Sequence, residues 1–201
     1  MNRNDAWGRA AAMAVLPCLV LAGIGFGVAL PEFSHLRHPL ALLGARGVPH
    51  ATGFDLLGFV LPGLLAAYAA VIAFPLTGDG RGWGHRIGVQ LLFLSGLAFA
   101  GMGLLPLDPA DLDGPESQRH AAAWLLWAVA FVPGAVALGA GIRARARGLA
   151  WLCLAVAALV AVCAFVPGLP PALSQRIAFA AWAAWFGVAA GHWPRAQIPR
   201  G

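Results

Sequence analysis

Six long apolar runs alternate with short polar segments along this chain. Each run is close to the roughly 20 residues that a helix needs to cross the hydrocarbon core of a bilayer. The pattern predicts an all-α, polytopic membrane protein, with residues 1–201 forming a single domain that is a bundle of six transmembrane helices. The predicted spans cover about residues 10–30, 56–74, 87–105, 121–141, 149–166 and 177–193.

The first run follows Arg3 and Arg9, so a cleaved signal peptide has to be weighed against a retained helix. A signal peptide ends in a small-residue cleavage site. Here Pro31 directly follows the apolar stretch. The run is also long enough to span a bilayer, so it is interpreted as a retained first helix.

Composition supports a membrane protein and excludes a soluble one. Charged residues make up 10% of the chain and hydrophobic residues 60%, with a mean hydropathy of +0.77. Soluble domains carry about 25% charged residues. The 13 basic residues are all Arg and lie in short segments between the apolar runs. This distribution lacks the clustered basic face of a nucleic-acid-binding protein, so no nucleic-acid partner is expected.

The distribution of Arg predicts the orientation of the chain. Nine Arg residues lie on the side that holds both termini, and four lie on the other side. Because cytoplasmic loops carry an excess of Lys and Arg, both termini are predicted to be cytoplasmic and the first and third loops to face outward. The nine are Arg3, Arg9, Arg81, Arg86, Arg143, Arg145, Arg147, Arg195 and Arg200.

Polar side chains concentrate in the two loops that are predicted to face outward. Imidazoles and carboxylates at one membrane face could coordinate a divalent metal such as zinc, or act as general acids and bases. The same residues could equally be solvated loop side chains, and none of them matches a defined ligand motif. They are His35, His38, His50 and Asp55 in the first loop, and Asp108, Asp111, Asp113, Glu116 and His120 in the third.

Asp55 and His120 are the most informative members of this group, because each stands at the predicted start of a helix. A cation is disfavoured at a helix N-terminus, so His120 is expected to be neutral and hydrogen-bonded to a carboxylate or a backbone group. Asp108 and His120 are candidates for a catalytic pair. Together with His38 and Asp55 they are also the candidate metal ligands, because both helix starts lie at the same membrane face.

Trp124 and Trp127 follow His120 at helical spacing, so the three side chains can share one helix face. Aromatic packing explains this strip, and an amphipathic ligand could use it as well. The candidate ligand-binding residues are therefore His38, Asp55, Trp124 and Trp127.

Other local patterns concern helix shape and packing. Pro17, Pro62 and Pro133 fall within predicted helices, where each can kink the helix and open a cavity. Two pairs of small residues, Gly23 with Gly27 in the first run and Gly96 with Ala100 in the third, are suited to close helix contact. In the first loop, the apolar stretch 40–43 is expected to form a short interfacial or re-entrant helix.

Three motifs resemble the prokaryotic six-helix membrane proteins classed as domain of unknown function 998. They are the stretch 38–45, HPLALLGA; the stretch 58–65, GFVLPGLL; and the stretch 105–108, LPLD, followed by His120. The resemblance covers essentially the whole chain. It implies a six-helix fold in a prokaryotic cell (inner) membrane, and it implies no established activity or catalytic residue.

Three functions remain open from the sequence. The first is a membrane protein that binds or passes a small or lipid-like ligand at the outer face. It depends on the kinked helices, the aromatic strip and the outward polar cluster. The second is a metal-dependent membrane hydrolase with an outward-facing His/Asp site. The third is an accessory subunit whose polar loops contact another membrane protein.

Overall fold

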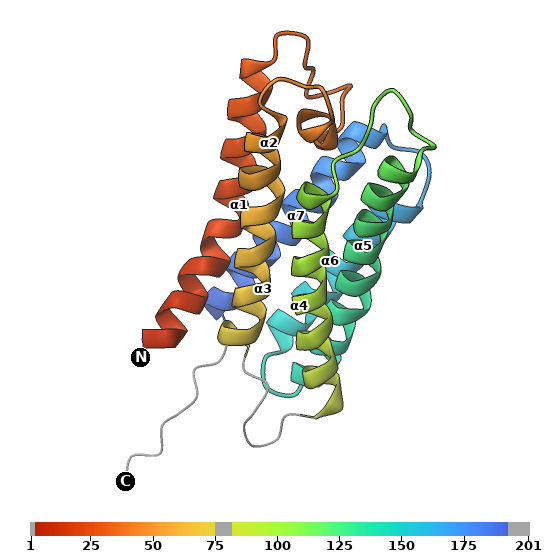
Figure 1. The fold of residues 1–201 in the computed structure, drawn as a ribbon. Helices are drawn as coiled ribbons and strands as arrows, with labels where there is room; N and C mark the ends of the chain where they lie inside the picture. Colours follow the sequence, from red (N-terminus) through yellow and green to blue (C-terminus); the bar gives the residue numbers. More distant parts are fainter. Residues whose placement is uncertain (1–2, 75–81, 193–201) are drawn as a thin grey trace.

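The computed structural model describes residues 3–74 and 82–192. Helices dominate this part of the chain (Figure 1). Three short helices, η1, α2 and the π-helical η2, precede α3, and α2, η2 and α3 follow one another without a break. The elements are α1 Arg3–Ala29, η1 Leu40–Gly44, α2 Ala51–Phe54, η2 Asp55–Val60, α3 Leu61–Ala73, α4 Trp83–Leu104, α5 Pro115–Ile142, α6 Arg147–Phe165 and α7 Pro171–His192.

Five helical spans among the described residues are long and apolar enough to cross a membrane: α1, Ala51–Ile72, α4, α5 and α6. Helix α7 is as long as α4, at 22 residues. Its first turns carry the polar residues Ser174, Gln175 and Arg176, and it packs against both α1 and α6. The prediction of an all-α membrane bundle is confirmed.

Several helices begin earlier in the chain than the apolar runs suggest. Helix α5 starts at Pro115, with Glu116 in its first turn, and α2 starts at Ala51. Pro at the first helical position and an acidic side chain in the first turn both favour a helix start. Such residues lie outside the apolar runs, so the runs place the helix starts too late in the chain. The prediction that Asp55 and His120 open their helices is therefore wrong, since each lies about one turn inside.

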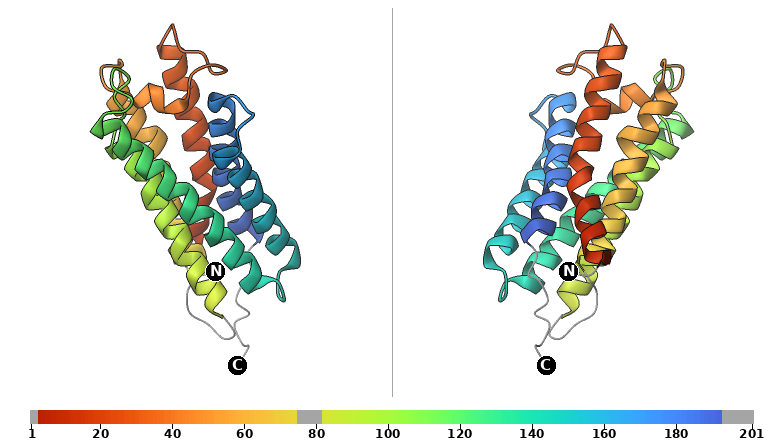
Figure 2. Two further views of the ribbon diagram at one scale, coloured as in Figure 1. Left: turned by 90° about the vertical axis from the view of Figure 1, so that its right-hand side faces the viewer. Right: turned by 90° about the vertical axis from the view of Figure 1, so that its left-hand side faces the viewer.

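The long helices form a closed ring. Each packs against the next one along the chain, and α7 returns to pack against α1 (Figures 1 and 2). The segments 30–50, 105–114 and 166–170 lie at one end of the ring, which we call the long-loop end. The opposite end, which we call the arginine end, holds six of the Arg residues that are predicted to be cytoplasmic: Arg3, Arg9, Arg86, Arg143, Arg145 and Arg147.

Arg81, Arg195 and Arg200 lie outside the described residues, as does Trp193 at the end of the last predicted span. The assignment of either end to the cytoplasm stays a prediction.

Aromatic side chains fill the centre of the ring. Phe99 of α4 stacks on Trp182 of α7, with 4.3 Å between the ring centroids and 20° between the planes. Phe179 contacts Phe99 and Trp127, each with 4.9 Å between centroids. All four side chains are fully buried. Large buried rings contribute strongly to packing, so this cluster joins α4, α5 and α7 into one core.

Small residues let α3 and α4 approach closely. A Cβ placed on Gly63 would collide with the backbone nitrogen of Ala100 and would lie 2.7 Å from the carbonyl oxygen of Gly96. Within lipid, close backbone packing of this kind replaces the hydrophobic driving force between helices. The predicted role of Gly96 and Ala100 in helix contact is confirmed. The other predicted pair, Gly23 and Gly27, faces the side chains of Leu40 and His35 in the first loop instead of another long helix.

The first loop is folded onto the bundle rather than extended from it. Its predicted short helix is confirmed as the 3-10 helix η1, in which Leu40 and Leu43 are buried. The Leu40 backbone N–H donates to Gln175 Oε1 over 2.7 Å, and Arg176 Nη1 donates to the His38 carbonyl over 2.8 Å. Two side chains from the start of α7 therefore hold this loop in place.

Candidate functional site

Asp55 is a carboxylate buried at the long-loop end. Its exposed fraction is 7%, and it is the first residue of the π-helical segment η2. The carboxylate lies directly against Gly44 of η1, where any Cβ would collide with Oδ1. Within the described residues, the carboxylate has no ion-pair partner and accepts no hydrogen bond. Glycine at position 44 is thus what leaves room for this carboxyl group.

The carboxylate of Asp55 borders a cavity of about 350 Å³, which we call the polar pocket. The wall combines a cation, an imidazole and a hydroxyl with backbone of the loop between η1 and α2. The lining residues that matter here are Gly44, Arg46, His50, Thr52, Asp55 and Pro106.

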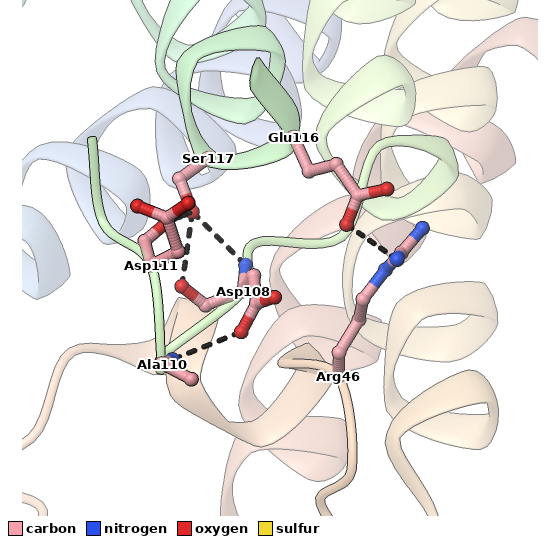
Figure 3. A network of polar contacts seen from close by, with 6 residues as sticks. All are labelled: Arg46, Asp108, Ala110, Asp111, Glu116 and Ser117. Atoms are coloured by element: carbon pink, nitrogen blue, oxygen red, sulfur yellow. Dashed lines mark hydrogen bonds and ion pairs between the residues drawn. The ribbon is translucent and has the colours of Figure 1, made fainter. Parts of the chain in front are cut away.

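Arg46 joins three parts of the chain at the rim of the polar pocket. Its backbone N–H donates to the Leu107 carbonyl over 3.0 Å, and its guanidinium forms an ion pair with Glu116 in the first turn of α5 (Figure 3). Both partners of this pair are partly exposed to solvent. An exposed pair contributes little to stability, and it leaves the Arg46 guanidinium at the rim of the pocket.

His50 connects the polar pocket to a second cavity. Its backbone adopts the left-handed conformation, with a φ of 62°, which is uncommon outside glycine. The second cavity, of about 520 Å³, lies between α1 and the α2–η2–α3 helix, and we call it the apolar groove. His50 lines both cavities.

The apolar groove faces the outside of the bundle. Leu21 and Leu57, two of its lining residues, are 70% and 49% exposed. In a membrane such side chains meet lipid. Gly25 and Cys18 of α1 also line the groove, and a Cβ on Gly25 would meet no atom within 4 Å. The groove is therefore an open apolar surface that leads to the imidazole of His50.

His120 has a structural role at the same end. Its Nδ1 lies 3.1 Å from the Met102 carbonyl oxygen and 2.9 Å from the Leu105 carbonyl oxygen. Because both partners are acceptors, Nδ1 carries the proton. The imidazole thus caps the last turn of α4, where carbonyls lack partners within the helix. The expectation that His120 bonds to a backbone group is confirmed.

Asp108 stabilises its own loop instead of pairing with His120. Its Oδ1 accepts the Ala110 backbone N–H over 2.9 Å, and its own N–H donates to Ser117 Oγ over 3.0 Å (Figure 3). The Ser117 hydroxyl also lies within reach of the Asp108 and Asp111 carbonyls. The expected contact between Asp108 and His120 is absent from the described residues: Asp108 bonds within its own loop, and His120 Nδ1 bonds to carbonyls at the end of α4.

His38 belongs to the turn that precedes η1. Its Nδ1 accepts the Ser34 backbone N–H over 3.1 Å, and its ring packs against Phe33 with 5.7 Å between centroids. It borders a further cavity of about 510 Å³ within the first loop, separate from Asp55. The structure thus places His38 and Asp55 in different cavities.

The four candidate metal ligands do not converge. Residues 3–74 and 82–192 contain no group of three or more His, Cys, Asp or Glu side chains that could hold a metal ion. Structural zinc sites use four ligands, and catalytic sites use three. The described side chains therefore do not fit a zinc centre built from His38, Asp55, Asp108 and His120.

Trp124 and Trp127 are part of the aromatic core. Trp127 is fully buried, and the two ring centroids are 6.5 Å apart. Trp124 also contacts Phe165 of α6 at 6.4 Å. The cavities described above do not include either ring. The strip predicted from helical spacing exists, and it packs inside the bundle.

The family model described as "Protein of unknown function (DUF998)" matches residues 6–192. The chain belongs to this family. No curated protein and no solved structure matches it. Membership in the DUF998 family assigns the chain no activity.

Sequence reasoning on this DUF998 protein missed Gly44 and Arg46 as neighbours of Asp55. It placed His50 in the same polar cluster as Asp55 but did not choose it as a site residue. A signal was present in the segment 38–45, where Gly44 closes an apolar stretch. Pro62 was a second signal, since it removes a helical hydrogen bond just after the π-helical segment η2. Such π-helical segments are often found at functional sites.

Proposed function

We propose that this protein binds a lipid-like amphiphile at its long-loop end, which the arginine distribution predicts to be the outer face. The apolar part of the ligand would lie in the apolar groove, and its headgroup would lie in the polar pocket. The observation that carries the proposal is the position of His50, which borders both cavities.

The two cavities differ in chemistry in the way that an amphiphile requires. Leu21, Leu57 and Phe26 line the groove, where an alkyl chain loses no hydrogen bonds on entering. Arg46, Thr52 and Asp55 line the pocket and offer charge and hydrogen-bonding groups. Ligand sites commonly combine a mostly apolar surface with a few placed polar groups.

Binding is favoured over passage through the ring. The fully buried rings of Phe99, Trp127, Phe179 and Trp182 occupy its centre. Interiors packed in this way leave few voids larger than a water molecule. The apolar groove is open to the side, so an amphiphile can enter it from the bilayer without crossing the core.

Hydrolysis receives less support from the same residues. His120 bonds to two backbone carbonyls through Nδ1, and Asp108 bonds within its own loop. A general base must come within hydrogen-bond reach of the proton that it removes, and His120 lines none of the three cavities described above. Among the described residues, neither Asp108 nor His120 forms a hydrogen bond or an ion pair with the carboxylate of Asp55.

Photocrosslinking tests the proposal. The full chain is reconstituted with a phospholipid that carries a diazirine on one acyl chain, and labelled peptides are mapped after irradiation. Peptides covering residues 18–29 and 57–61 should be labelled severalfold more than the lipid-exposed face of α5 near Val129, which is 52% exposed. Equal labelling of both faces would contradict a preferred site.

The substitution Gly25→Trp places an indole in the groove, because a Cβ there meets nothing within 4 Å. It should reduce groove labelling severalfold while the protein still purifies as a folded species. The matched control is Gly148→Trp at the arginine end, where a Cβ also meets nothing within 4 Å. Unchanged labelling in Gly25→Trp would rule out the groove as the binding surface.

A further inference from the structure

We infer that the polar pocket selects a headgroup that carries a primary ammonium, as in a phosphoethanolamine lipid, and that Asp55 is the group that receives it. This inference rests on the proposed amphiphile site and specifies its ligand class. It stands on the placement of the Asp55 carboxylate, which is more than nine-tenths buried and lines an open cavity.

A donor group that entered the pocket would stabilise the ionised carboxylate of Asp55. A buried carboxylate loses the hydrogen bonds that water would supply, and this loss is costly unless another group donates in its place. Within the described residues Asp55 has neither an ion pair nor a hydrogen-bond donor to its carboxylate. Arg46, the cation that lines the same pocket, is paired with Glu116 instead. The pocket therefore offers an unmatched acceptor to whatever enters it.

The kind of partner follows from charge and ligand number. A divalent metal needs several anionic or neutral ligands, and no group of three acidic, His or Cys side chains forms among the described residues. A primary ammonium needs fewer protein ligands than a divalent metal, because it carries one positive charge and three hydrogen-bond donors. One carboxylate balances its charge, and the hydroxyl of Thr52, which also lines the pocket, can accept a further hydrogen bond.

The rest of the headgroup fits the rim. Arg46 and His50 line the pocket nearer to solvent, and both are exposed. A guanidinium is well suited to a phosphate group. His50 also borders the apolar groove, so a phosphate bound at the rim lies between the ammonium at Asp55 and the acyl chains in the groove. A phosphoethanolamine lipid carries its ammonium, phosphate and acyl chains in the same order as the Asp55 carboxylate, the pocket rim and the apolar groove follow one another.

The test measures headgroup preference by native mass spectrometry of the purified full chain. The probes are phosphatidylethanolamine, its mono- and dimethylated forms, phosphatidylcholine and phosphatidylglycerol, all with the same acyl chains. Each methyl group removes one donor, so wild-type affinity should fall along the series. The total fall should be about tenfold, because a hydrogen bond to a charged group has a net value of that order.

Asp55→Asn keeps the shape of the side chain and removes its charge. It should lower affinity for phosphatidylethanolamine by about tenfold and for phosphatidylcholine by less, because the choline cation loses a charge partner but no hydrogen bond. The matched control is Asp113→Asn, an exposed carboxylate at the same end of the bundle. It should preserve the wild-type preference. The methylation series needs no variant, so it decides the question even if Asp55→Asn fails to fold.

Two results would overturn the inference and leave the amphiphile site standing. One is equal binding of phosphatidylethanolamine and phosphatidylcholine by the wild type while Gly25→Trp still reduces both. The other is a preference for phosphatidylglycerol, which would indicate an anion site at Arg46. Binding of none of the lipids at the groove would overturn the proposed function together with the inference.

Discussion

The carboxylate of Asp55 and the backbone of Gly44 are in direct contact, although the two residues belong to different helical elements. Gly44 ends the 3-10 helix η1, and Asp55 begins the π-helical segment η2. A side chain at position 44 would occupy the space that Asp55 Oδ1 now fills. The fold of the first loop and the position of the buried charge therefore depend on each other.

Gly44→Ala is predicted to destabilise the protein, because the new methyl group must displace the Asp55 carboxylate. Extra atoms in a packed site typically cost about 1–3 kcal/mol. The measurement is thermal unfolding of the purified protein in detergent. The control is Gly101→Ala in α4, where a Cβ would lie 3.7 Å from the Ala123 Cβ, an ordinary contact. Equal stability of the two variants would show that the carboxylate moves at no cost.

His120→Phe is predicted to destabilise the long-loop end. The ring is retained but the N–H is lost, so the carbonyls of Met102 and Leu105 lose their donor. Leaving buried groups unsatisfied costs about 1–3 kcal/mol. The same substitution at the exposed His35 keeps its ring contact with Phe33 and should change the unfolding temperature little. If both variants unfold together with the wild type, His120 is not a structural cap.

His50→Gly and His50→Ala should separate backbone strain from binding. Both remove the imidazole, so both should reduce phospholipid labelling in the groove. The left-handed conformation of residue 50 suits Gly and strains Ala, so the Gly variant should be more stable by about 1 kcal/mol. Paired melting curves and crosslinking yields check this. A more stable Ala variant would mean that residue 50 leaves the left-handed conformation.

The bundle could be predicted from the sequence because its cause is local in the chain. Apolar runs of membrane-spanning length predict helices whatever their neighbours are. The pairing of Gly96 and Ala100 with α3 followed from residue size. The expectation of a backbone partner for His120 is met, although its premise, a position at a helix start, is wrong. Each of these predictions used only residues close together in sequence.

The site could not be predicted in the same way because it depends on loop conformation. Nothing in the spacing of Asp108 and His120 indicates that Ser117 will bond to Asp108 and keep the two candidates apart. The burial of Asp55 depends on Gly44, in a loop that side chains of α7 hold in place through Leu40. A contact that needs three separate segments leaves no periodic signal in any one of them.

The orientation of the chain in the membrane decides on which side the amphiphile would bind. In the topology predicted from the sequence, nine Arg residues fall on the side of the termini and four on the other, so the positive-inside rule predicts that the long-loop end faces outward. In a variant in which Cys18, Cys153 and Cys163 are replaced by Ala, a single Cys is introduced at Ala110 or at Ala144, both exposed. An impermeant maleimide should label Ala110→Cys in intact cells and should label Ala144→Cys only after permeabilisation. Labelling of both after permeabilisation confirms that each thiol is accessible.

The reverse pattern in intact cells would place Asp55 and the polar pocket at the cytoplasmic face, and the ligand would then have to come from the inner leaflet.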